Sequence, residues 1–454
     1  MSKLRLAALV AVALLVVGVA VGLYLGRPQP VGPPSLLLVT IDTLRADRVG
    51  ALGGPRGLTP AIDRLAASGL VFENAVAAVP LTLPSHATLL SGLDPMHHGV
   101  RNNGTYTFPA DRETLATRLK AAGYATGAFV GAVVLDRRYG LARGFDVYDD
   151  RIDRASSGRS VLESERACGD VVDSASRWLQ ARKGPSFAWV HLYEPHAPYA
   201  PPEDLAAAHP GAPYDAEVAA ADQCLAKVLE VARRAAPGGL VVAVASDHGE
   251  GLGDHGEERH GLFVYQSTLR IPVVISGRGI EAKREKGLFR AADLTPTLLG
   301  ILGVAAPTGI DGRDARSGGA SEAYAESEYA SSFGWAPLHS WRIGPLKFID
   351  APRPELYDLS EDPGEKRDLA AQRPDDVAHL RAVLVRARAD ERRQDQKQAG
   401  EEVEERLRSL GYVAGGAPEG EESVELPDPK DAVSRLIDFE RAIEGEAKDR
   451  TGAI

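Results

Sequence analysis

Three short apolar segments of this chain each end in side chains that bind metals or move protons. The segments and the side chains that follow them are residues 36–41 with Asp42, residues 187–192 with Glu194 and His196, and residues 240–246 with Asp247 and His248. Continuous apolar runs of this length predict buried strands of a parallel sheet. Such sheets bind ligands at the edge where their strands end. The sequence therefore predicts one crevice that collects carboxylates and imidazoles from three separate strands.

Helical patterns alternate with these strands along the chain. The predicted helices span residues 59–69, 111–123, 161–181, 215–234 and 293–302, and further strands span 126–130 and 271–275. Asp111 is expected to cap the second of these helices. The alternation favours an α/β fold, a mostly parallel sheet with helices on both faces. From about residue 320, shorter strand-like pieces at 341–349 and 355–359 indicate a smaller C-terminal α+β subdomain.

Thr82 lies at the start of a predicted short helix that Pro84 could begin and Gly92 could end. Free backbone N–H groups and the helix dipole favour an anion at such a position, either an alkoxide or a bound phosphate or sulfate. A threonine before a helix is most often an ordinary cap. Other parts of the chain must therefore supply the rest of any chemistry.

A metal ion would connect Thr82 to the strand ends. Asp42, Asp247 and His248 offer the carboxylate oxygens and imidazole nitrogen that zinc and manganese accept. A threonine hydroxyl is a poor nucleophile at neutral pH, and coordination to a divalent cation makes it an alkoxide. We therefore predict one divalent ion bound by Asp42, Thr82, Asp247 and His248. The imidazole ligand favours manganese or zinc over calcium or magnesium.

The motifs of this chain, taken in order, resemble those of the sulfatase family of the alkaline phosphatase superfamily. They are residues 39–45, 59–63, 84–92, 194–199, 246–250 and 260–261, with 355–359 and 362–365 near the end. The resemblance extends from about residue 36 to residue 370. It implies an alkaline-phosphatase-like sheet, a smaller C-terminal subdomain, and hydrolysis of sulfate or phosphate esters through a covalent enzyme intermediate.

The chain also departs from the pattern of this family. Typical sulfatases carry Cys-x-Pro-x-Arg or Ser-x-Pro-x-Arg, whose first residue is oxidised to formylglycine, whereas this chain has Thr82 and His86 at the first and last positions. The usual pair of adjacent acids is reduced to Asp42 followed by Thr43, and residues 131–134 replace a stretch with the usual lysine and histidine. These features are similar to those of members with an unmodified threonine, namely phosphodiesterases, phosphonate hydrolases and lipid-headgroup phosphoglycerol transferases.

The resemblance implies a role for each of several side chains. Thr82 would be the nucleophile, His196 would donate to or orient the leaving oxygen, and His260 would be a second imidazole that activates water. Substrate binding is assigned to Arg101, His86 and Arg45, with one of the two arginines replacing the lost cationic contact. The pair 97–98 could line the same pocket. His191, inside a predicted strand, is interpreted as a core residue more often than as a functional one.

The two ends of the sequence bear on its location and partners. Residues 6–25 are uncharged and rich in Leu, Val and Ala, and Lys3 and Arg5 precede them. This pattern predicts an uncleaved signal anchor, or a signal peptide, and hence a catalytic domain anchored to a membrane in the periplasm or outside the cell. The formal net charge of -11 argues against binding to nucleic acid. Cys168 and Cys224 could form a disulfide or be small buried side chains.

The predicted organisation and function follow from these features. The expected segments are a signal anchor (1–27), a linker (28–35), a catalytic domain (36–319), a C-terminal subdomain (320–372), a charged helical segment (373–412), a second linker (413–426) and an amphipathic helix (427–454). We expect a metal-dependent hydrolase of a small-molecule, glycan or lipid-headgroup ester, with phosphate or phosphonate slightly favoured. A sulfatase proper, a membrane-linked phosphoglycerol-type transferase and an inactive binding protein remain alternatives.

Overall fold

The computed structural model describes residues 32–152, 165–392 and 426–435, and a large sheet lies at its centre. The strands of this sheet are β1 (Ser35–Ile41), β2 (Leu70–Val76), β3 (Ala125–Phe129), β4 (Val147–Asp149), β5 (Ser186–Leu192), β6 (Leu240–Ser246), β7 (Arg270–Gly277) and β8 (Lys283–Arg290). Their order is β4-β3-β5-β1-β6-β7-β2-β8. Strand β7 is antiparallel to both of its neighbours, and the other pairs are parallel. The sheet is therefore mostly parallel, as predicted.

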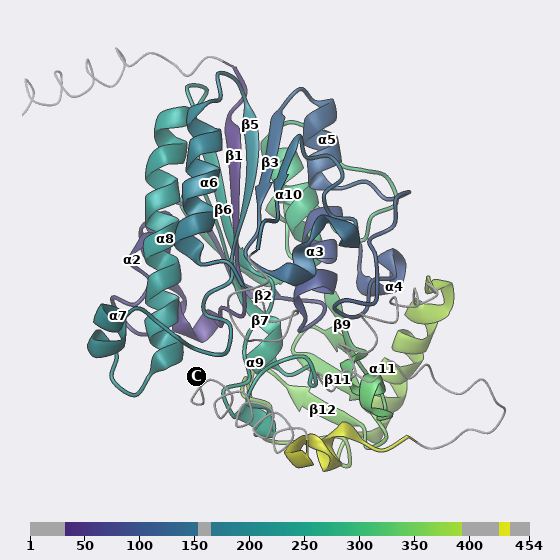
Figure 1. Ribbon diagram of the computed structural model, residues 1–454. Coiled ribbons are helices and arrows are strands. Elements are labelled where there is room, and N and C mark those ends of the chain that lie inside the picture. The colour runs from purple at the N-terminus through teal and green to yellow at the C-terminus, as the bar shows by residue number, and fades with distance from the viewer. Residues whose placement is uncertain (1–31, 153–164, 393–425, 436–454) are drawn as a thin grey trace, which may run out of the picture.

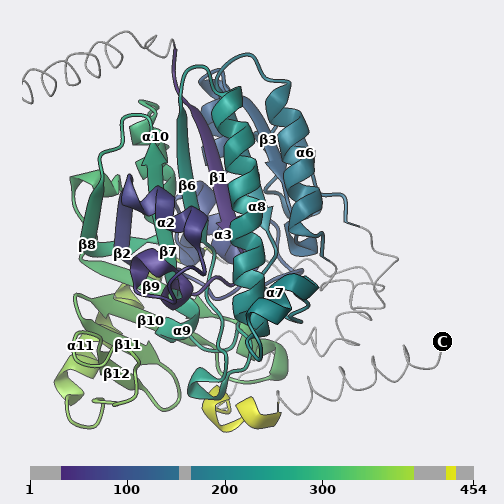
Figure 2. The same cartoon turned by 90° about the vertical axis from the view of Figure 1, so that its left-hand side faces the viewer.

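Helices cover both faces of the large sheet (Figure 1). One face carries α2 (Pro60–Ala67), α6 (Cys168–Gln180) and α8 (Pro213–Ala235), and the other carries α3 (Thr82–Ser91), α5 (Leu115–Ala121) and α10 (Leu294–Ile301). Figure 2 shows α8 lying along the central strands. Every residue of β1 is buried, which explains its continuous apolar sequence. The short helices α4 (Pro95–His98), α7 (Glu203–Ala208) and α9 (Gln266–Leu269) lie in the connections.

A second, smaller domain contains an antiparallel sheet at the end of the large sheet where β1 ends (Figure 1). Its strands are β9 (Glu322–Ser327), β10 (Leu338–Ile343), β11 (Leu346–Asp350) and β12 (Glu355–Asp358), and α11 (Pro374–Ala387) packs on it. The N–H of Glu326 donates to the carbonyl of Ala78 in the loop before α3. These features confirm the predicted fold class, an alkaline-phosphatase-like α/β sheet with a smaller C-terminal subdomain.

A disulfide joins Cys168 of α6 to Cys224 of α8. Both cysteines also lie in the apolar core on that face of the sheet. The alternative left open by the sequence is therefore decided in favour of the disulfide. Its closed loop of about 56 residues limits the conformations of the unfolded chain.

The predicted membrane anchoring is corrected by the structure. Within residues 32–152, 165–392 and 426–435, every helix is too short or too polar to cross a bilayer. The predicted anchor, residues 6–25, lies outside these described residues, so the structure gives a membrane location no support and we do not retain it. Other predicted segments also lie wholly or partly outside the described residues. The residues concerned are 1–27, 153–164, 393–425 and 436–454.

Two helix boundaries differ from the prediction. Thr114, not Asp111, caps α5, because its hydroxyl accepts from the N–H of Thr117 while Thr117 accepts from Thr114. This reciprocal pair satisfies two helix N–H groups that a single aspartate further upstream could not reach. In the described part of the C-terminal helix, the chain forms a 3-10 turn at Pro429–Asp431. Asp428 accepts from the N–H of Lys430 at the start of this turn.

Candidate active site

Helix α3 places Thr82 at its first turn, pointing into the interior of the protein. The helix begins at Thr82 and ends before Gly92, whose φ of 75° suits glycine and closes the helix in the left-handed region. The Thr82 side chain is buried, and its hydroxyl lies 3.5 Å from Oδ2 of Asp42. The predicted end at Gly92 is thus confirmed, whereas the helix begins at Thr82, two residues before the predicted start at Pro84, and the Thr82 hydroxyl reaches the end of β1.

Asp42 and Asp247 follow two adjacent parallel strands. Ile41 of β1 pairs with Ser246 of β6, so the next residue on each strand lies at the same edge. Oδ1 of Asp247 accepts from the N–H of His248 at 2.9 Å and from the N–H of Thr43 at 3.3 Å. Its other oxygen faces Asp42 and the imidazoles. The strand register therefore explains why two carboxylates meet although 205 residues separate their strands.

Four buried polar atoms at this point have no hydrogen-bond partner among the described residues. They are Oδ1 of Asp42, Oδ2 of Asp247, Nε2 of His191 and Nε2 of His248. Buried polar atoms are normally satisfied, so each such atom requires an explanation. All four residues have an exposed fraction of 0%. A cation bound among them would supply the missing partner.

The distances between these atoms fit metal ligands better than hydrogen bonds. Nε2 of His248 lies 3.6 Å from Oδ1 of Asp42 and 3.5 Å from Oδ2 of Asp247. These separations are too long for strong hydrogen bonds. Ligands about 2.1 Å from a tetrahedral zinc ion lie about 3.4 Å from one another. Asp42, Asp247 and His248 form a candidate metal-binding group, and the atoms present therefore fit a divalent ion.

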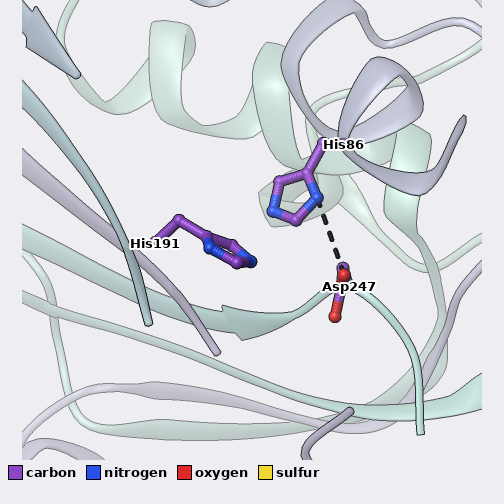
Figure 3. A group of neighbouring side chains, drawn as sticks. All are labelled: His86, His191 and Asp247. Carbon is purple, nitrogen blue, oxygen red and sulfur yellow. Dashed lines mark ion pairs between the residues drawn. The ribbon is translucent and has the colours of Figure 1, made fainter. Parts of the chain in front are cut away.

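A second candidate group shares Asp247 and adds His86 and His191 (Figure 3). Nδ1 of His86 lies 3.6 Å from Oδ2 of Asp247, and Nε2 of His191 lies 3.4 Å from Oδ2 of Asp42. Both nitrogens of His86 already have partners, the carbonyl of Thr82 at 2.8 Å and the hydroxyl of Thr40 at 3.0 Å. The group of Asp42, Asp247 and His248 is therefore the better fit for a metal ion.

Burial controls the protonation of the cluster. It raises the pKa of Asp42 to about 7 and also raises the pKa of Asp247. Burial lowers the pKa of His86 to about 3 and that of His191 to about 4, so both imidazoles are neutral at ordinary pH. Burial opposes the charged form of His248, but the carboxylates of Asp247 and Asp42 outweigh it and raise its pKa. Two carboxylates in such surroundings favour a bound cation.

A row of imidazoles continues from His248 toward the small domain. The ring centroids of His248 and His260 are 4.5 Å apart, and those of His260 and His196 are 5.0 Å apart. Nδ1 of His260 lies 2.9 Å from Oε1 of Glu250, whose Oε2 accepts from the hydroxyl of Tyr199 at 3.0 Å. Burial lowers the pKa of both His196 and His260 well below the ordinary value. The structure thus brings both predicted catalytic histidines to the cluster.

The sequence reasoning missed the roles of Glu250, Tyr199 and His191. Glu250 and Tyr199 stand inside motifs that were recognised, but nothing in the sequence shows that the loop after β5 folds over the loop after β6. His191 was interpreted as a core residue because it lies inside an apolar strand. Because side chains alternate along a strand, the sequence shows only which residues share a face with His191. The residues that surround its side chain are known only from the fold.

The arginines predicted to bind the substrate, and the histidines predicted to line its pocket, contact other groups of the protein. Arg45 donates to the carbonyls of Glu250 and Gly251, at 2.9 Å and 3.1 Å, so it supports the loop that carries Glu250. Arg101 is buried and pairs with Glu326 and Glu391. His97 pairs with Asp311 at 2.8 Å, and His98 lies 3.0 Å from the hydroxyl of Thr88. Among the described contacts, none joins Arg101 or His97 to Thr82.

Comparisons with known proteins agree with this geometry. The sulfatase family model matches residues 34–304. A Δ4,5-hexuronate-2-O-sulfatase from Bacteroides thetaiotaomicron is 24% identical over 410 residues, which cover 74% of this chain and 84% of that protein. An ulvan-active sulfatase from Formosa agariphila is 26% identical, covering 62% of this chain and 64% of its own length. A phosphonate monoester hydrolase from Agrobacterium radiobacter has a similar structure, with a TM-score of 0.66, 21% identity, and coverage of 78% of this chain and 95% of that one.

The fold and the buried group of carboxylates and imidazoles define a hydrolase of the alkaline-phosphatase-like class. The chain belongs to the sulfatase family, whose members are metal-dependent hydrolases of ester bonds.

Proposed function

We propose that this protein is a metal-dependent hydrolase of phosphate or phosphonate esters that forms a covalent intermediate on Thr82. The observation that carries the proposal is the place of the Thr82 hydroxyl, buried at the start of α3 and 3.5 Å from Asp42. Thr82 stands where the family pattern has the cysteine or serine that is converted to formylglycine. A threonine cannot give that aldehyde, so the unmodified hydroxyl is the group available for attack.

The cation is proposed to be zinc or manganese, held by Asp42, Thr82, Asp247 and His248. When bound, it would lower the pKa of the Thr82 hydroxyl and offset the negative charge on the substrate oxygens. The identity of the metal rests on the mixed donor set, since calcium and magnesium prefer oxygen ligands alone. Asp42, with a pKa raised by burial to about 7, is the carboxylate that gains most from this neutralisation.

In the first step, Oγ of Thr82 forms a bond to phosphorus and the bond to the departing alcohol oxygen breaks. His196 is suited to move the proton. Its Nδ1 lies 2.5 Å from the carbonyl of Ala197, which leaves Nε2 as the basic nitrogen. A neutral imidazole of this kind takes the Thr82 proton and returns it to the departing oxygen. The products of this step are the free alcohol and a Thr82 ester.

In the second step, water cleaves the Thr82 ester. Nδ1 of His260 donates to Glu250, so Nε2 of His260 accepts a proton from the attacking water. The new oxygen–phosphorus bond forms as the bond to Oγ of Thr82 breaks. Oγ then recovers the proton, and inorganic phosphate or the phosphonate is released. The carboxylate of Glu250 orients His260 and stabilises its transient positive charge.

Sulfate esters are the second candidate substrate. Two of the proteins named above are sulfatases, namely a Δ4,5-hexuronate-2-O-sulfatase and an ulvan-active sulfatase. The same two steps would apply with sulfur in place of phosphorus. A sugar ester is therefore included among the substrates to be tested.

The test is hydrolysis of matched aryl phosphate monoesters, phosphodiesters, phosphonates and sulfates by the full chain. Zinc, manganese and calcium are added in turn to chelator-treated protein. We expect phosphoester turnover with zinc or manganese, and its loss in Thr82→Ala. Thr88→Ala, in the next turn of the same helix, is the control for helix damage. Dominant sulfate turnover would contradict the phosphoester preference, and full activity of Thr82→Ala would contradict the nucleophile.

A further inference from the structure

The ring of His86 links α3 to β1 through Thr40 and, through the same threonine, to β5. Nε2 lies 3.0 Å from the hydroxyl oxygen of Thr40 on β1, and Nδ1 lies 2.8 Å from the carbonyl oxygen of Thr82. The same Thr40 oxygen accepts from the indole N–H of Trp189 on β5 at 2.9 Å. His86, Thr40 and Trp189 each have an exposed fraction of 0%. Bulk solvent therefore does not reach these three side chains.

The donors and acceptors of this chain allow one arrangement of protons. The indole N–H of Trp189 can only donate, so the oxygen of Thr40 accepts from it. The hydroxyl hydrogen of Thr40 is then free to donate to Nε2 of His86, and Nε2 accepts it because Nδ1, which faces the carbonyl of Thr82, carries the ring hydrogen. In a neutral imidazole, the other nitrogen carries the hydrogen. Nδ1–H of His86 therefore donates to the carbonyl of Thr82.

The surroundings of Nδ1 decide this assignment. This nitrogen faces two oxygens that can only accept, the carbonyl of Thr82 at 2.8 Å and, when ionised, Oδ2 of Asp247 at 3.6 Å. A lone pair on Nδ1 would be repelled by both. Figure 3 shows the ring of His86 directed at Asp247, with His191 on the other side.

The geometry points to His86 as a positioning residue that fixes Thr82 for attack. The carbonyl of Thr82 holds it in the Nδ1–H tautomer, and the hydroxyl of Thr40 donates to its Nε2. Leu81 precedes α3 and its apolar side chain cannot cap the helix. The bond from Nδ1–H to the Thr82 carbonyl thus ties the nucleophile's own backbone to β1 and β5. This role replaces the substrate-binding role predicted from the sequence, and it rests on the proposed role of Thr82.

A second cation bound by His86, His191 and Asp247 is the opposite interpretation of the same side chains. It would require a lone pair on Nδ1 of His86, because Nδ1 is the nitrogen that faces Asp247. The two interpretations therefore differ in what is bound to Nδ1 of His86. A proton on Nδ1 excludes a metal there, and a metal on Nδ1 excludes the proton.

The first test is nitrogen NMR of the full chain labelled at its histidines, with and without zinc. We expect a proton on Nδ1 and an unprotonated Nε2 for His86 in both states, with the signals assigned by their loss in His86→Asn. A proton on Nε2, or a zinc-induced change at Nδ1 together with two zinc ions per chain, would overturn the assignment. This result is independent of substrate, so it stands or fails separately from the proposed function.

The second test compares two buried threonines that both contact a histidine through Nε2. We expect Thr40→Val to lower kcat about 30-fold with little change in KM, because a small shift of a nucleophile costs one to two orders of magnitude. Thr88→Val removes the corresponding contact from α3 to His98 of α4 and should change kcat less than about threefold, because this contact does not reach Thr82. Equal losses in the two variants would overturn the positioning role.

Substitutions of His86 itself distinguish its two nitrogens. The amide nitrogen of asparagine can occupy the place of Nδ1, whereas that of glutamine can occupy the place of Nε2. We therefore expect His86→Asn to retain about tenfold more kcat than His86→Gln, because it keeps the donor to the Thr82 carbonyl. Unfolding temperatures of both variants show whether each is folded. The reverse order of activity in folded variants would contradict the proposal.

Discussion

Two groups of charged side chains are almost completely buried in this protein, and they differ in how their atoms are satisfied. In the small domain, Nζ of Lys347 donates to Glu365 at 2.6 Å and to the carbonyl of Val264 at 2.5 Å. The other oxygen of Glu365 accepts from the N–H of Gln266 at 2.5 Å. In the large domain, the side-chain atoms of Asp42 and His248 that face each other are 3.6 Å apart and unpaired among the described residues.

This difference separates a structural charge pair from a binding site. Burial of charge is common to both groups, so burial alone does not mark a functional site. The Lys347 pair contains opposite charges at hydrogen-bond distance and needs no further partner. The group around Asp42 has two acids, neutral imidazoles and ligand-like spacing, so it is complete only with a cation.

The largest expected effect is on ester hydrolysis, when one of the two buried carboxylates of the site is substituted. Asp247→Asn should lower ester hydrolysis about 10⁴-fold and abolish zinc binding, because it weakens both the charge and the orientation of one ligand. In chelated protein, the same substitution should leave the unfolding temperature unchanged or raise it, because it removes a buried negative charge whose Oδ2 has no hydrogen-bond partner among the described residues. Turnover, metal content and thermal unfolding measure the three effects. A clear destabilisation of the chelated protein would show that Asp247 is structural.

The next largest effect is a loss of stability in the small domain, where a buried charge does have a partner. Lys347→Met should destabilise the fold by about 3 kcal/mol, because it leaves Glu365 buried without its positive partner. Urea unfolding at neutral pH measures the loss. The double variant Lys347→Met with Glu365→Gln is the control, and it should recover part of the stability. If the single variant were as stable as the wild type, the contrast between the two groups would fail.

The smallest effect concerns His97, a half-buried histidine that is paired with Asp311. The bond to Asp311 raises the pKa of His97 above its usual value. The folded protein therefore holds this proton more tightly than the unfolded chain, and the resulting stability is present below about pH 6.5 and is lost as the pH rises through the folded pKa. We expect wild type to exceed His97→Gln by about 0.5 kcal/mol at pH 5.5, and by less at pH 8.5. A difference that grows with pH in urea unfolding would contradict this.

The sequence predicted which site residues follow the strands better than it predicted which strands and side chains lie beside one another. Asp42, Asp247 and His248 follow continuous apolar runs, so strand pattern and residue type were sufficient to bring them together. The position of β2 between β7 and β8 could not be predicted, because its partners are 200 residues away and β7 runs antiparallel.

The role of His86 depends on contacts that no local pattern contains. The sequence shows that a histidine replaces the arginine of the family pattern, and this favoured substrate binding. Its Nε2 contacts Thr40 of β1, and Thr40 in turn accepts from Trp189 of β5. The contacts of Arg101 could not be predicted for the same reason, since its acidic partners Glu326 and Glu391 lie more than 200 residues later.

Strand β1 comes first along the chain among the strands of the described residues, yet it lies in the middle of the large sheet. Its neighbours come much later, because Ser186 follows its partner Ser35 by 151 residues and Ser246 follows its partner Ile41 by 205 residues. A ribosome therefore releases Asp42 and Thr82 long before it makes either flanking strand. Contacts over such separations form slowly. An N-terminal fragment that stops before Leu240 lacks β6 beside β1, so the nascent chain completes the centre of its site only after β6 has been made.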